Sequence, residues 1–538
     1  MRAMSIDVRR ISAWALRAAA AAAVATFFFG RQPSTPSVAF TGLPSGNENT
    51  SVLVQNAGST AATIAMDVYT PGGVLIPGAT EVRPNIPPGG TAWFAQATNS
   101  GLLPGFRGVG VISSDQPVNA LRVDDILDPS RSTQNKSYSL ASAGGSGGHK
   151  LALPMLFNEL LTAHWNSRIA IANAGTQTAC VRITYYLVPG VGGATPPGPA
   201  PAPVVDNGSG GGGCSAGYPV PAGGQLTIGR EPGYTRFPLA TDNNQMAAVV
   251  EVLNPNPNNR VTAVVDIYRS DGNRLLGSYN GLVDDGPGSS TDDVGTDVIV
   301  PIALKSTSGF YTVIGVMNLD GTAADVNITY AGRLNDGQGA LQTRTVTLPG
   351  VTNVAFHSTY SAGTNVDVGF IGSARVSSSA RVAVVVIRGK LTSAGSGVNE
   401  PSYAAVNGVP VDRAATSWSL PLIFRRFAPG APPSVGYNSW IQVQVPDGGS
   451  ANVTLRFVGD PTSGCQTGPF TSTHPVTGSK VFYMNLDTPD NGFGGSTPPC
   501  FFGGATVTAD RPVIVIGQVG ADKFPGGDSE GLYNAFPN

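Results

Sequence analysis

A two-strand pattern that occurs four times limits most strongly what this chain can fold into. Its first strand reads VLVQNAG at residues 52–58, IAIANAG at 169–175, VIGVMNLDG at 313–321 and IQVQVPDGG at 441–449. The strand that follows reads AATIAMDVY, TACVRITYY, AADVNITYA and SANVTLRFV. Apolar and polar residues alternate in each strand, and the connecting turn is rich in Asn, Asp and Gly, which is typical of a β-hairpin. The sequence therefore predicts four copies of one β-structured unit.

Further segments recur in the same order around each hairpin. A strand after a Pro/Gly turn comes next, then a strand of small residues such as GFRGVGVISS at 105–114, then an apolar closing strand such as NNRVTAVVDIY at 258–268. The second, third and fourth copies open on an apolar strand that contains Pro154, Pro301 or Pro421, and the first copy lacks this opener. Proline in a strand favours an edge position, where its missing N–H costs no ladder bond.

About seven short strands in roughly 100–120 residues are typical of an immunoglobulin-like β-sandwich. The repeat is too long for the blade of a propeller or the coil of a solenoid, so a single fold of either kind is disfavoured. We predict an all-β chain of four tandem immunoglobulin-like sandwiches after an N-terminal signal or anchor helix. The predicted boundaries are 1–30 for the signal or anchor, 36–136, 137–275, 276–398 and 399–522 for the sandwiches, and 523–538 for a C-terminal tail.

One insertion and the junctions between copies modify this plan. The second sandwich carries a low-complexity insertion at residues 189–213, PGVGGATPPGPAPAPVVDNGSGGGG. A Ser-Tyr step follows each of the first three copies, at Ser137-Tyr138, Ser278-Tyr279 and Ser402-Tyr403. Tyr533 and Asn534 look like a fourth junction with no sandwich after it. Either this segment is a frayed tail, or it docks on the first unit of another copy and produces head-to-tail assembly.

The N-terminus and the cysteines both predict export. Arg2, Arg9 and Arg10 precede an apolar stretch at 11–30, and Ala23-Val24-Ala25 resembles a signal-peptidase site. The alternative is an uncleaved anchor, in which case residues 11–29 alone would contact the membrane. Cys180 and Cys214 are 34 residues apart and Cys465 and Cys500 are 35 apart, so two local disulfides are the simplest pairing. Zinc binding is the alternative, but the chain has no CxxC spacing and no His close in sequence to either pair. We expect a secreted or cell-surface protein.

Composition and motifs give no support for an enzyme. Only 12 % of the residues are charged and the net charge is −2, so the chain lacks the electrostatic footprint of a nucleic-acid-binding protein. The two G-x-S-x-G matches, at 144–148 and 213–217, do not join a strand to a helix as a nucleophile elbow must. The four histidines are scattered over three copies without a metal-binding spacing. We predict no catalytic residues, no metal site and no cofactor.

Two weaker signals leave alternatives open. Five aspartates gather in the second junction, where they form either a calcium site or a solvated linker: Asp284, Asp285, Asp292, Asp293 and Asp297. Four tryptophans lie in or beside predicted strands, where they either stack on sugars or pack in the core: Trp93, Trp165, Trp418 and Trp440. We favour the solvated linker and core packing.

The repeated motifs resemble a known group of proteins. Segments such as LPLI, GF-x-GSA-x-V-SS and the SYNG step resemble tandem repeats of proteins secreted or displayed by filamentous green non-sulfur bacteria. The resemblance covers the chain beyond residue 36. It implies a surface or extracellular-matrix component and brings no catalytic residues with it. We therefore expect a non-enzymatic structural protein that self-associates into a surface layer, sheath or filament. The alternative is an adhesin that contacts glycans or a cell surface.

Overall fold

The structure of the chain is a computed structural model, and its described residues contain β-strands and no α-helix. It describes residues 47–538 except 128–135, 143–146, 162–163, 189–200, 232, 240–241, 270–275, 287–288, 290–291, 308, 335–338, 340, 361–365, 391–401, 428–435, 496 and 522–529. The predicted signal or anchor at 1–30 lies outside the described residues. The predicted all-β class is confirmed. We call the four successive groups of strands units 1 to 4.

Units 1 and 2 contain the first seventeen strands. Unit 1 comprises β1 (Asn47–Asn56), β2 (Ala62–Tyr69), β3 (Glu81–Ile86), β4 (Thr91–Ala95), β5 (Val109–Ser114), β6 (Val118–Leu127) and β7 (Lys136–Ser142). Unit 2 comprises β8 (Lys150–Asn158), β9 (Trp165–Asn173), β10 (Ala179–Leu187), β11 (Val204–Asp206), β12 (Tyr218–Val220), β13 (Gln225–Ile228), β14 (Asn244–Val252), β15 (Val261–Arg269), β16 (Leu276–Asn280) and β17 (Leu282–Val283).

Units 3 and 4 follow the same order with two much longer strands. Unit 3 comprises β18 (Gly295–Thr307), β19 (Phe310–Asn318), β20 (Ala324–Arg333), β21 (Leu341–Val351), β22 (Val354–Ser358), β23 (Phe370–Lys390), β24 (Ser402–Asn407) and β25 (Val409–Pro410). Unit 4 comprises β26 (Ala415–Arg425), β27 (Tyr437–Gln444), β28 (Ser450–Gly459), β29 (Phe470–Thr477), β30 (Ser479–Tyr483), β31 (Phe501–Ala521), β32 (Gly531–Asn534) and β33 (Phe536–Pro537). Three short 3-10 turns complete the described elements: η1 (Gln96–Thr98), η2 (Val411–Arg413) and η3 (Pro489–Asn491).

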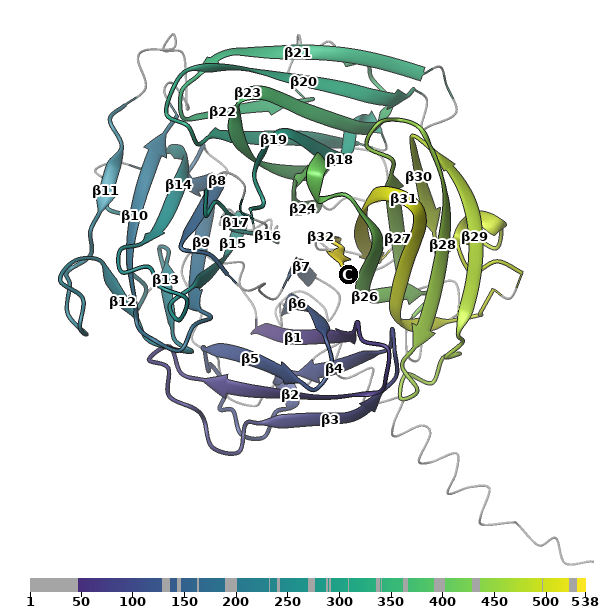
Figure 1. Cartoon of the computed structure of the whole chain (residues 1–538), viewed down its shortest axis with the longest axis horizontal. Coiled ribbons are helices and arrows are strands. Elements are labelled where there is room, and N and C mark those ends of the chain that lie inside the picture. Colours follow the sequence, from purple (N-terminus) through teal and green to yellow (C-terminus); the bar gives the residue numbers. More distant parts are fainter. Residues whose placement is uncertain are drawn as a thin grey trace, which may run out of the picture.

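Each unit places its strands in two sheets with a repeated order. The inner sheets, which lie toward the centre of Figure 1, run β4-β1-β6-β7, β13-β9-β15-β16, β22-β19-β23-β24 and β30-β27-β31-β32. The outer sheets run β3-β2-β5, β11-β10-β14-β8-β17, β21-β20-β23-β18-β25 and β29-β28-β31-β26-β33. In units 3 and 4 one bent strand, β23 or β31, belongs to both sheets.

This order differs from that of a constant-type immunoglobulin domain, in which the last two strands share one sheet. Here the strand of small residues lies in the outer sheet. The closing strand lies in the inner sheet, beside the first strand of the repeated two-strand motif. In unit 2, for example, β14 pairs with β10, whereas β15 pairs with β9. The bend of β23 and β31 shows the reason, because one continuous strand crosses from one sheet to the other.

The predicted hairpin is wrong, because the two strands of the repeated motif lie in different sheets: β1 pairs with β4 and β6, whereas β2 pairs with β3 and β5. The recurring Asn at the end of the first strand has a structural role that three units share. Asn56 accepts a hydrogen bond from the backbone N–H two residues ahead, and its Nδ2 donates to the carbonyls of Thr60 and Ile86. Asn173 and Asn318 make the equivalent three bonds in units 2 and 3. One side chain thus closes the turn as an Asx-turn and ties it to a neighbouring segment. This explains why Asn recurs at the end of the first strand.

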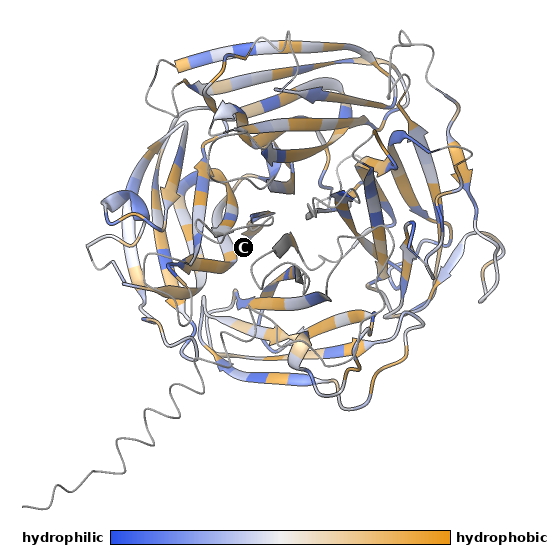
Figure 2. Ribbon diagram, turned by 180° about the vertical axis from the view of Figure 1, so that it is seen from behind, coloured by the Kyte–Doolittle hydropathy of each residue, from blue (hydrophilic) through white to orange (hydrophobic). Residues whose placement is uncertain are grey.

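Apolar residues fill the space between the sheets and continue from one unit to the next. Apolar and polar residues alternate along many strands (Figure 2), as a half-buried sheet requires. Four clusters of buried apolar side chains result, and each is centred on one unit. Three of these clusters also include side chains of a neighbouring unit, which joins the units into one body.

Candidate functional site

Four short strands, one from each unit, meet at the centre of the molecule. They are β7, β16, β24 and β32, and they contain or adjoin the Ser-Tyr and Tyr-Asn steps singled out in the sequence (Figure 1). Each pairs with the closing strand of its own unit, and each also contacts the corresponding strands of both neighbouring units. The contacts run from β7 to β16, β24 and β32 and back to β7, so they form a closed ring. We call these strands the central ring.

Asparagines connect three members of the central ring. The backbone N–H of Asn407 donates to Asn534 Oδ1 at 3.1 Å, and Asn534 Nδ2 donates to the carbonyl of Asn407 at 2.9 Å. Asn407 Nδ2 in turn donates to the carbonyl of Asn280 at 3.0 Å. These residues are spaced 127 positions apart in the chain, so they occupy equivalent places in units 2, 3 and 4.

The C-terminal tail lies in this ring, which corrects the prediction that it docks on another copy. Tyr533 is only 2 % exposed, and its hydroxyl donates to the carbonyl of Leu422 in its own unit at 2.7 Å. Tyr279 makes the matching bond to Met155 in unit 2 at 2.6 Å. The tail is therefore the last strand of unit 4 and fills the fourth place in the central ring. The frayed-tail alternative is also wrong for residues 531–537, because they pair as β32 and β33.

Unit 4 meets unit 1 through direct contacts that close the chain into a ring of units. Thr91 Oγ1 donates to the carbonyl of Pro421 at 3.0 Å, and Gln55 Nε2 donates to that of Ala505 at 3.0 Å. The rings of Trp93 and Phe502 pack edge to face with centroids 5.6 Å apart. Gly504 leaves room for this contact, since a Cβ there would lie 2.6 Å from Thr91 Oγ1.

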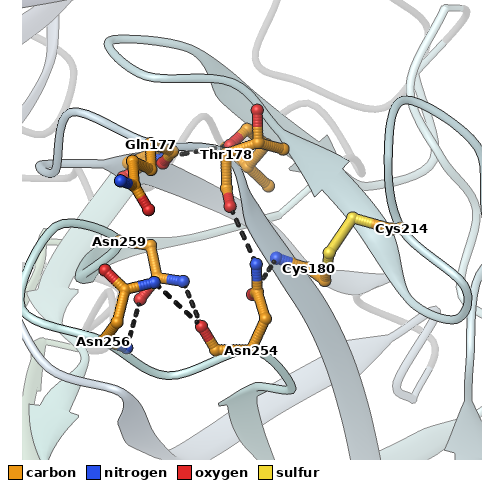
Figure 3. The surroundings of a disulfide bond; sticks show 9 residues. Gln177, Thr178, Cys180, Cys214, Asn254, Asn256 and Asn259 are labelled. Carbon is orange, nitrogen blue, oxygen red and sulfur yellow. Dashed lines mark hydrogen bonds between the residues drawn. A yellow bond between two sulfur atoms is a disulfide. The ribbon is translucent and has the colours of Figure 1, made fainter.

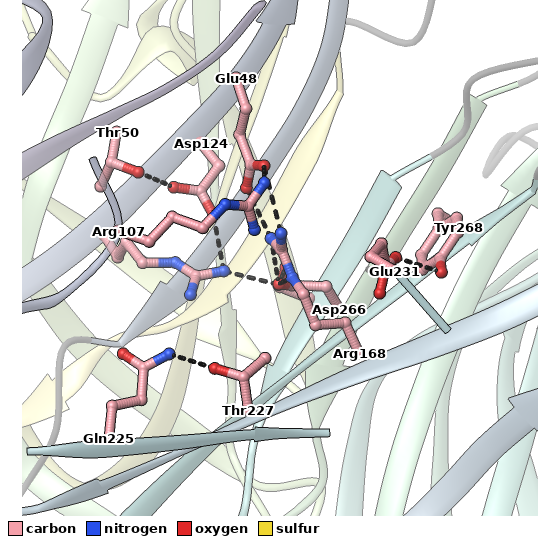
Figure 4. A network of polar contacts seen from close by, with 12 residues as sticks. Glu48, Thr50, Arg107, Asp124, Arg168, Gln225, Thr227, Glu231, Asp266 and Tyr268 are labelled. Atoms are coloured by element: carbon pink, nitrogen blue, oxygen red, sulfur yellow. Dashed lines mark hydrogen bonds and ion pairs between the residues drawn. The ribbon is translucent and has the colours of Figure 1, made fainter. Parts of the chain in front are cut away.

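The contact between units 1 and 2 is different, because charged side chains dominate it (Figure 4). Arg168 on β9 donates to Glu48 at 2.6 Å and to Asp266 at 2.7 Å. Arg122 on β6 binds Asp266 at 2.5 Å and Asp124 at 2.7 Å. Arg107 lies 3.4 Å from Glu48 and also covers the ring of Tyr234, with its guanidinium carbon 5.2 Å from the centroid. We call these residues the ionic seam.

The charges of the ionic seam balance, and two hydroxyl groups donate hydrogen bonds to its carboxylates. Three arginines face three carboxylates, so the network is neutral when all are ionised. Ser278 donates to Asp266 at 2.5 Å and Thr50 donates to Asp124 at 2.7 Å. Asp266 is fully buried and Asp124 is 1 % exposed. A buried ion pair of this kind requires such partners, because the desolvation of unpaired charges costs several kcal/mol each.

The carboxylates of the ionic seam differ in pKa. Burial raises the pKa of Asp124 to about 6, and the charge of Arg122 offsets this only in part. Burial also acts to raise the pKa of Asp266, but the charges of Arg122 and Arg168 and the bond from Ser278 hold it well below its usual value. The pKa of Glu48 is lowered because Arg168 outweighs the effect of burial. Asp124 is thus the group of the seam that titrates nearest to neutral pH.

Sequence reasoning missed the ionic seam, although a signal was present. Arg122, Arg168 and Asp266 each interrupt an apolar strand of a chain that has few charges. Inward-facing charges in a buried strand usually need a partner of opposite sign. Asp124 lies on the same strand as Arg122, but the other partners could not be assigned, because they come from strands that are more than 70 residues apart in the chain.

Both predicted disulfides are present. Cys180 bonds Cys214 and Cys465 bonds Cys500, with Cα–Cα distances of 5.6 and 5.3 Å. The first bridge joins β10 to the end of the segment that contains the 189–213 insertion. Asn254 reinforces it, because Asn254 Oδ1 accepts from the N–H of Cys180 at 2.8 Å and its Nδ2 donates to the carbonyl of Thr178 at 3.0 Å (Figure 3). The two disulfides are consistent with an extracellular location.

The five junction aspartates are paired with basic side chains. Asp284 is 2 % exposed and lies 2.6 Å from both Lys150 and Arg381. Asp285 accepts from the N–H of His149 at 2.7 Å, and Asp297 binds Arg375. Within the described part of the chain, no three His, Cys, Asp or Glu residues are grouped so that they could hold a metal ion. The described part of the junction is therefore an ion-paired contact between units 2 and 3, and the prediction of a solvated linker is wrong there.

The other residues singled out in the sequence have individual partners within the fold. His149, His164, His357 and His474 have separate partners, which are Asn256, Glu159, the ring of Tyr330 and Ser472. Trp418 is 2 % exposed, and Trp165 packs on Tyr403 of unit 3 with centroids 4.7 Å apart. Ser146 lies outside the described residues. Ser215 follows Cys214 in a tight turn closed by a bridge between Gly211 and Cys214.

Two further findings concern membrane-spanning helices and the similarity of the sequence to known proteins. Among the described residues, no helix has the length and apolar character needed to cross a bilayer. The sequence matches no known protein family and no curated protein.

Proposed function

We propose that this protein is an exported, non-enzymatic structural protein whose chain forms one ring-shaped subunit of a cell-surface layer, sheath or extracellular filament. The closed central ring is the observation that carries the proposal. It fixes four similar units in one block, and a block of this kind is suited to bearing load and to repeated lateral contact. The two disulfides and the resemblance to surface repeat proteins agree with a location outside the cell.

In this proposal each repeat is a sandwich of immunoglobulin-like size with its own strand order, and the chain holds four of them. Copies associate through outward-facing surfaces, because Tyr533 and Asn534 are bound within the central ring of their own chain. The most exposed large apolar side chains are Leu103 in unit 1, at 81 %, and Leu341 in unit 3, at 70 %. Exposed apolar side chains of this size are candidates for contact with another copy.

Electron microscopy of the native protein from the cell surface or culture fluid tests the proposal. We expect regular filaments or sheets whose repeat matches one ring or a small number of rings. Purified protein carrying Leu103→Asp and Leu341→Asp should associate less than the wild type, while its melting temperature stays the same. A protein that remains as single rings at the concentrations found on the cell surface would contradict the structural role.

A second candidate function is adhesion to glycans, and one surface feature favours it. Tyr360 is 63 % exposed, and its ring lies 5.6 Å from that of Tyr311. Exposed aromatic rings stack on the apolar faces of sugars. Glycan-array binding that is lost in Tyr360→Ala, but kept in the Leu103→Asp variant, would favour adhesion over assembly.

A further inference from the structure

One core position of unit 3 carries a histidine where the other units carry an apolar side chain. His357 lies on β22 and is paired with Ile314 of β19. The same place in the inner sheets of the other units holds Phe94, Ile228 or Phe482. All three of these side chains are fully buried. A titratable ring therefore occupies a core position that is apolar in the rest of the molecule.

The surroundings of His357 contain no group that could balance a positive charge. The residue is 8 % exposed, and its Nε2 has no hydrogen-bond partner among the described residues. Its ring centroid lies 5.8 Å from that of Tyr330 on β20, which carries a neutral hydroxyl group. Along the inner sheet, the neighbouring positions are the apolar Ile314 and Val386. Of the described charged groups, Lys305 on β18 is the one that acts on the ring, and it is positive.

These surroundings make the neutral form of the imidazole the stable form in the folded protein. Burial, and to a smaller extent the charge of Lys305, lowers the pKa of His357 below its usual value. In the unfolded chain a histidine takes up its proton near pH 6.5. Below this pH the unfolded state binds more protons than the folded state, so acid lowers the free energy of opening. This loss ends below the folded-state pKa, where both states carry the proton.

The opposite face of β22 connects unit 3 to unit 2. Val354 and Phe356 pack against the apolar cluster of unit 2. The approach is close beside them, since a Cβ on Gly315 would lie 2.8 Å from Cε of Met155 and 3.1 Å from the ring of Phe356. Among the described strands, β22 pairs with β19 alone, so it is the edge strand of its inner sheet. An edge strand opens locally more readily than a strand held on both sides.

We propose that His357 makes the contact between units 2 and 3 sensitive to acid. When the imidazole takes up a proton, β22 detaches from β19, because the described surroundings offer the buried imidazolium no anionic partner. Phe356 then leaves the apolar cluster of unit 2, and the ring of units loosens at this contact. The contact lies within one chain, so the response to acid is independent of assembly between copies.

Hydrogen exchange of the full chain between about pH 7.5 and pH 5 tests this response. Each pH unit below about 6.5 should weaken the protection of the β22 amides by up to about tenfold, after correction for intrinsic exchange. Amides of β10, in the outer sheet of unit 2, should keep their protection. His357→Phe should abolish the pH dependence of β22, because phenylalanine fills the same place in units 1 and 4. His357→Ile, as in unit 2, serves as a second variant if the larger ring does not fit.

Methionine oxidation gives a second readout at the contact itself. Met155 is fully buried, so its reaction with hydrogen peroxide depends on opening of the contact. Peptide mass spectrometry should show faster oxidation of Met155 at about pH 5.5 than at about pH 7.5 in the wild type, and no difference in His357→Phe. Met66, which is buried in unit 1, should stay protected at both pH values. Simultaneous oxidation of both methionines would mean global unfolding and would overturn a local opening.

A matched control separates His357 from the other groups that titrate in acid. Burial also lowers the pKa of His474, but this residue lies in unit 4, so His474→Phe should keep the acid response of β22. Burial raises the pKa of Asp292 and Asp293 at the contact between units 2 and 3, and both remain in His357→Phe. A response that persists in His357→Phe would therefore belong to the aspartates and overturn the role of His357. Equal protection of β22 across this pH range in the wild type would overturn the acid response itself.

Discussion

Individual charged residues form the centre of the contact between units 1 and 2. Arg168 is 5 % exposed and is shared by Glu48 and Asp266, which come from units 1 and 2. At the other contacts, apolar side chains such as Met317 and Leu532 join the core of the neighbouring unit. The ionic seam thus depends on a few residues, and its strength depends on pH.

Arg168→Met should destabilise the protein by about 3–5 kcal/mol, because it leaves two carboxylates near the interface without their main partner. Urea denaturation of the full chain measures this. Arg182→Met is the matched control, since the pair of Arg182 with Glu251 is more than a third exposed and should contribute at most about 1 kcal/mol. Equal effects of the two substitutions would show that the seam is solvated.

The contributions of Asp124 and Asp266 to the free energy of unfolding should change in opposite directions with pH. The folded-state pKa of Asp124 is raised to about 6, so its contribution to stability falls as the pH rises from about 4 to 6. The free energy of unfolding of Asp124→Asn, relative to the wild type, should therefore increase over this range. The pKa of Asp266 is lowered, so its contribution is present above about pH 4 and is lost below it.

Asp266→Asn should accordingly be less stable than the wild type at neutral pH, and the difference should shrink below about pH 4. Urea titrations of both variants across this pH range provide the comparison. If the two variants change in the same direction with pH, the assignment of opposite pKa shifts is wrong.

The strands at the centre of the molecule and the strands at its periphery have different roles. The central strands are buried and tie the units together, as β32 does through Tyr533 and Asn534. The outermost strands β3, β21 and β29 carry Pro84, Pro349 and Pro475. Proline in an edge strand hinders pairing with another sheet. Association between copies is therefore expected through the faces of the outer sheets and not through their edges.

Tyr533→Ala should cost roughly 3–5 kcal/mol of stability, because it empties a fully buried site in the central ring. Thermal and chemical denaturation measure the loss. The control is Tyr360→Ala, whose ring is exposed and whose removal should change stability by less than about 0.5 kcal/mol. Deletion of residues 530–538 removes β32 altogether, so we expect it to loosen the ring of units.

At the scale of the whole molecule, the chain is a closed ring of units with a single non-covalent closure, between units 4 and 1. Contacts between successive units are helped by the chain that connects them, but the closure depends only on packing and hydrogen bonds. Gly504 lies at this closure, where a Cβ would also approach the carbonyl oxygen of Gly89 to 2.9 Å.

Gly504→Leu should open the closure, because its side chain would clash with the backbone carbonyl of Gly89 and with the side chains of Thr91 and Gln55. We expect a larger radius of gyration in small-angle X-ray scattering and faster hydrogen exchange in β4 and β26. Gly495→Leu is the control, since a Cβ there meets no atom within 4 Å. A closed ring in the Gly504 variant would show that the closure accommodates the added side chain.

The sequence by itself determined the local features of the protein. Alternation predicted the strands, and cysteine spacing gave both disulfide pairs. The Asn-Ala-Gly turns marked the end of the first repeated strand, but the two strands that they join lie in different sheets and form no hairpin. These features depend on residues that are close in the chain, so a pattern in the sequence can report them. The recurring Tyr-Asn step also marked the tail as equivalent to the junctions.

Only the tertiary structure decided where that tail goes and how the sheets are shared. Tyr533 looks the same in sequence whether it docks in its own chain or in another, and the choice depends on whether four units close around one centre. The partners of Arg168 likewise come from distant strands, and the bend of β23 decides which sheet the closing strand joins. Such choices depend on packing between segments far apart in the chain, which a repeat pattern does not specify.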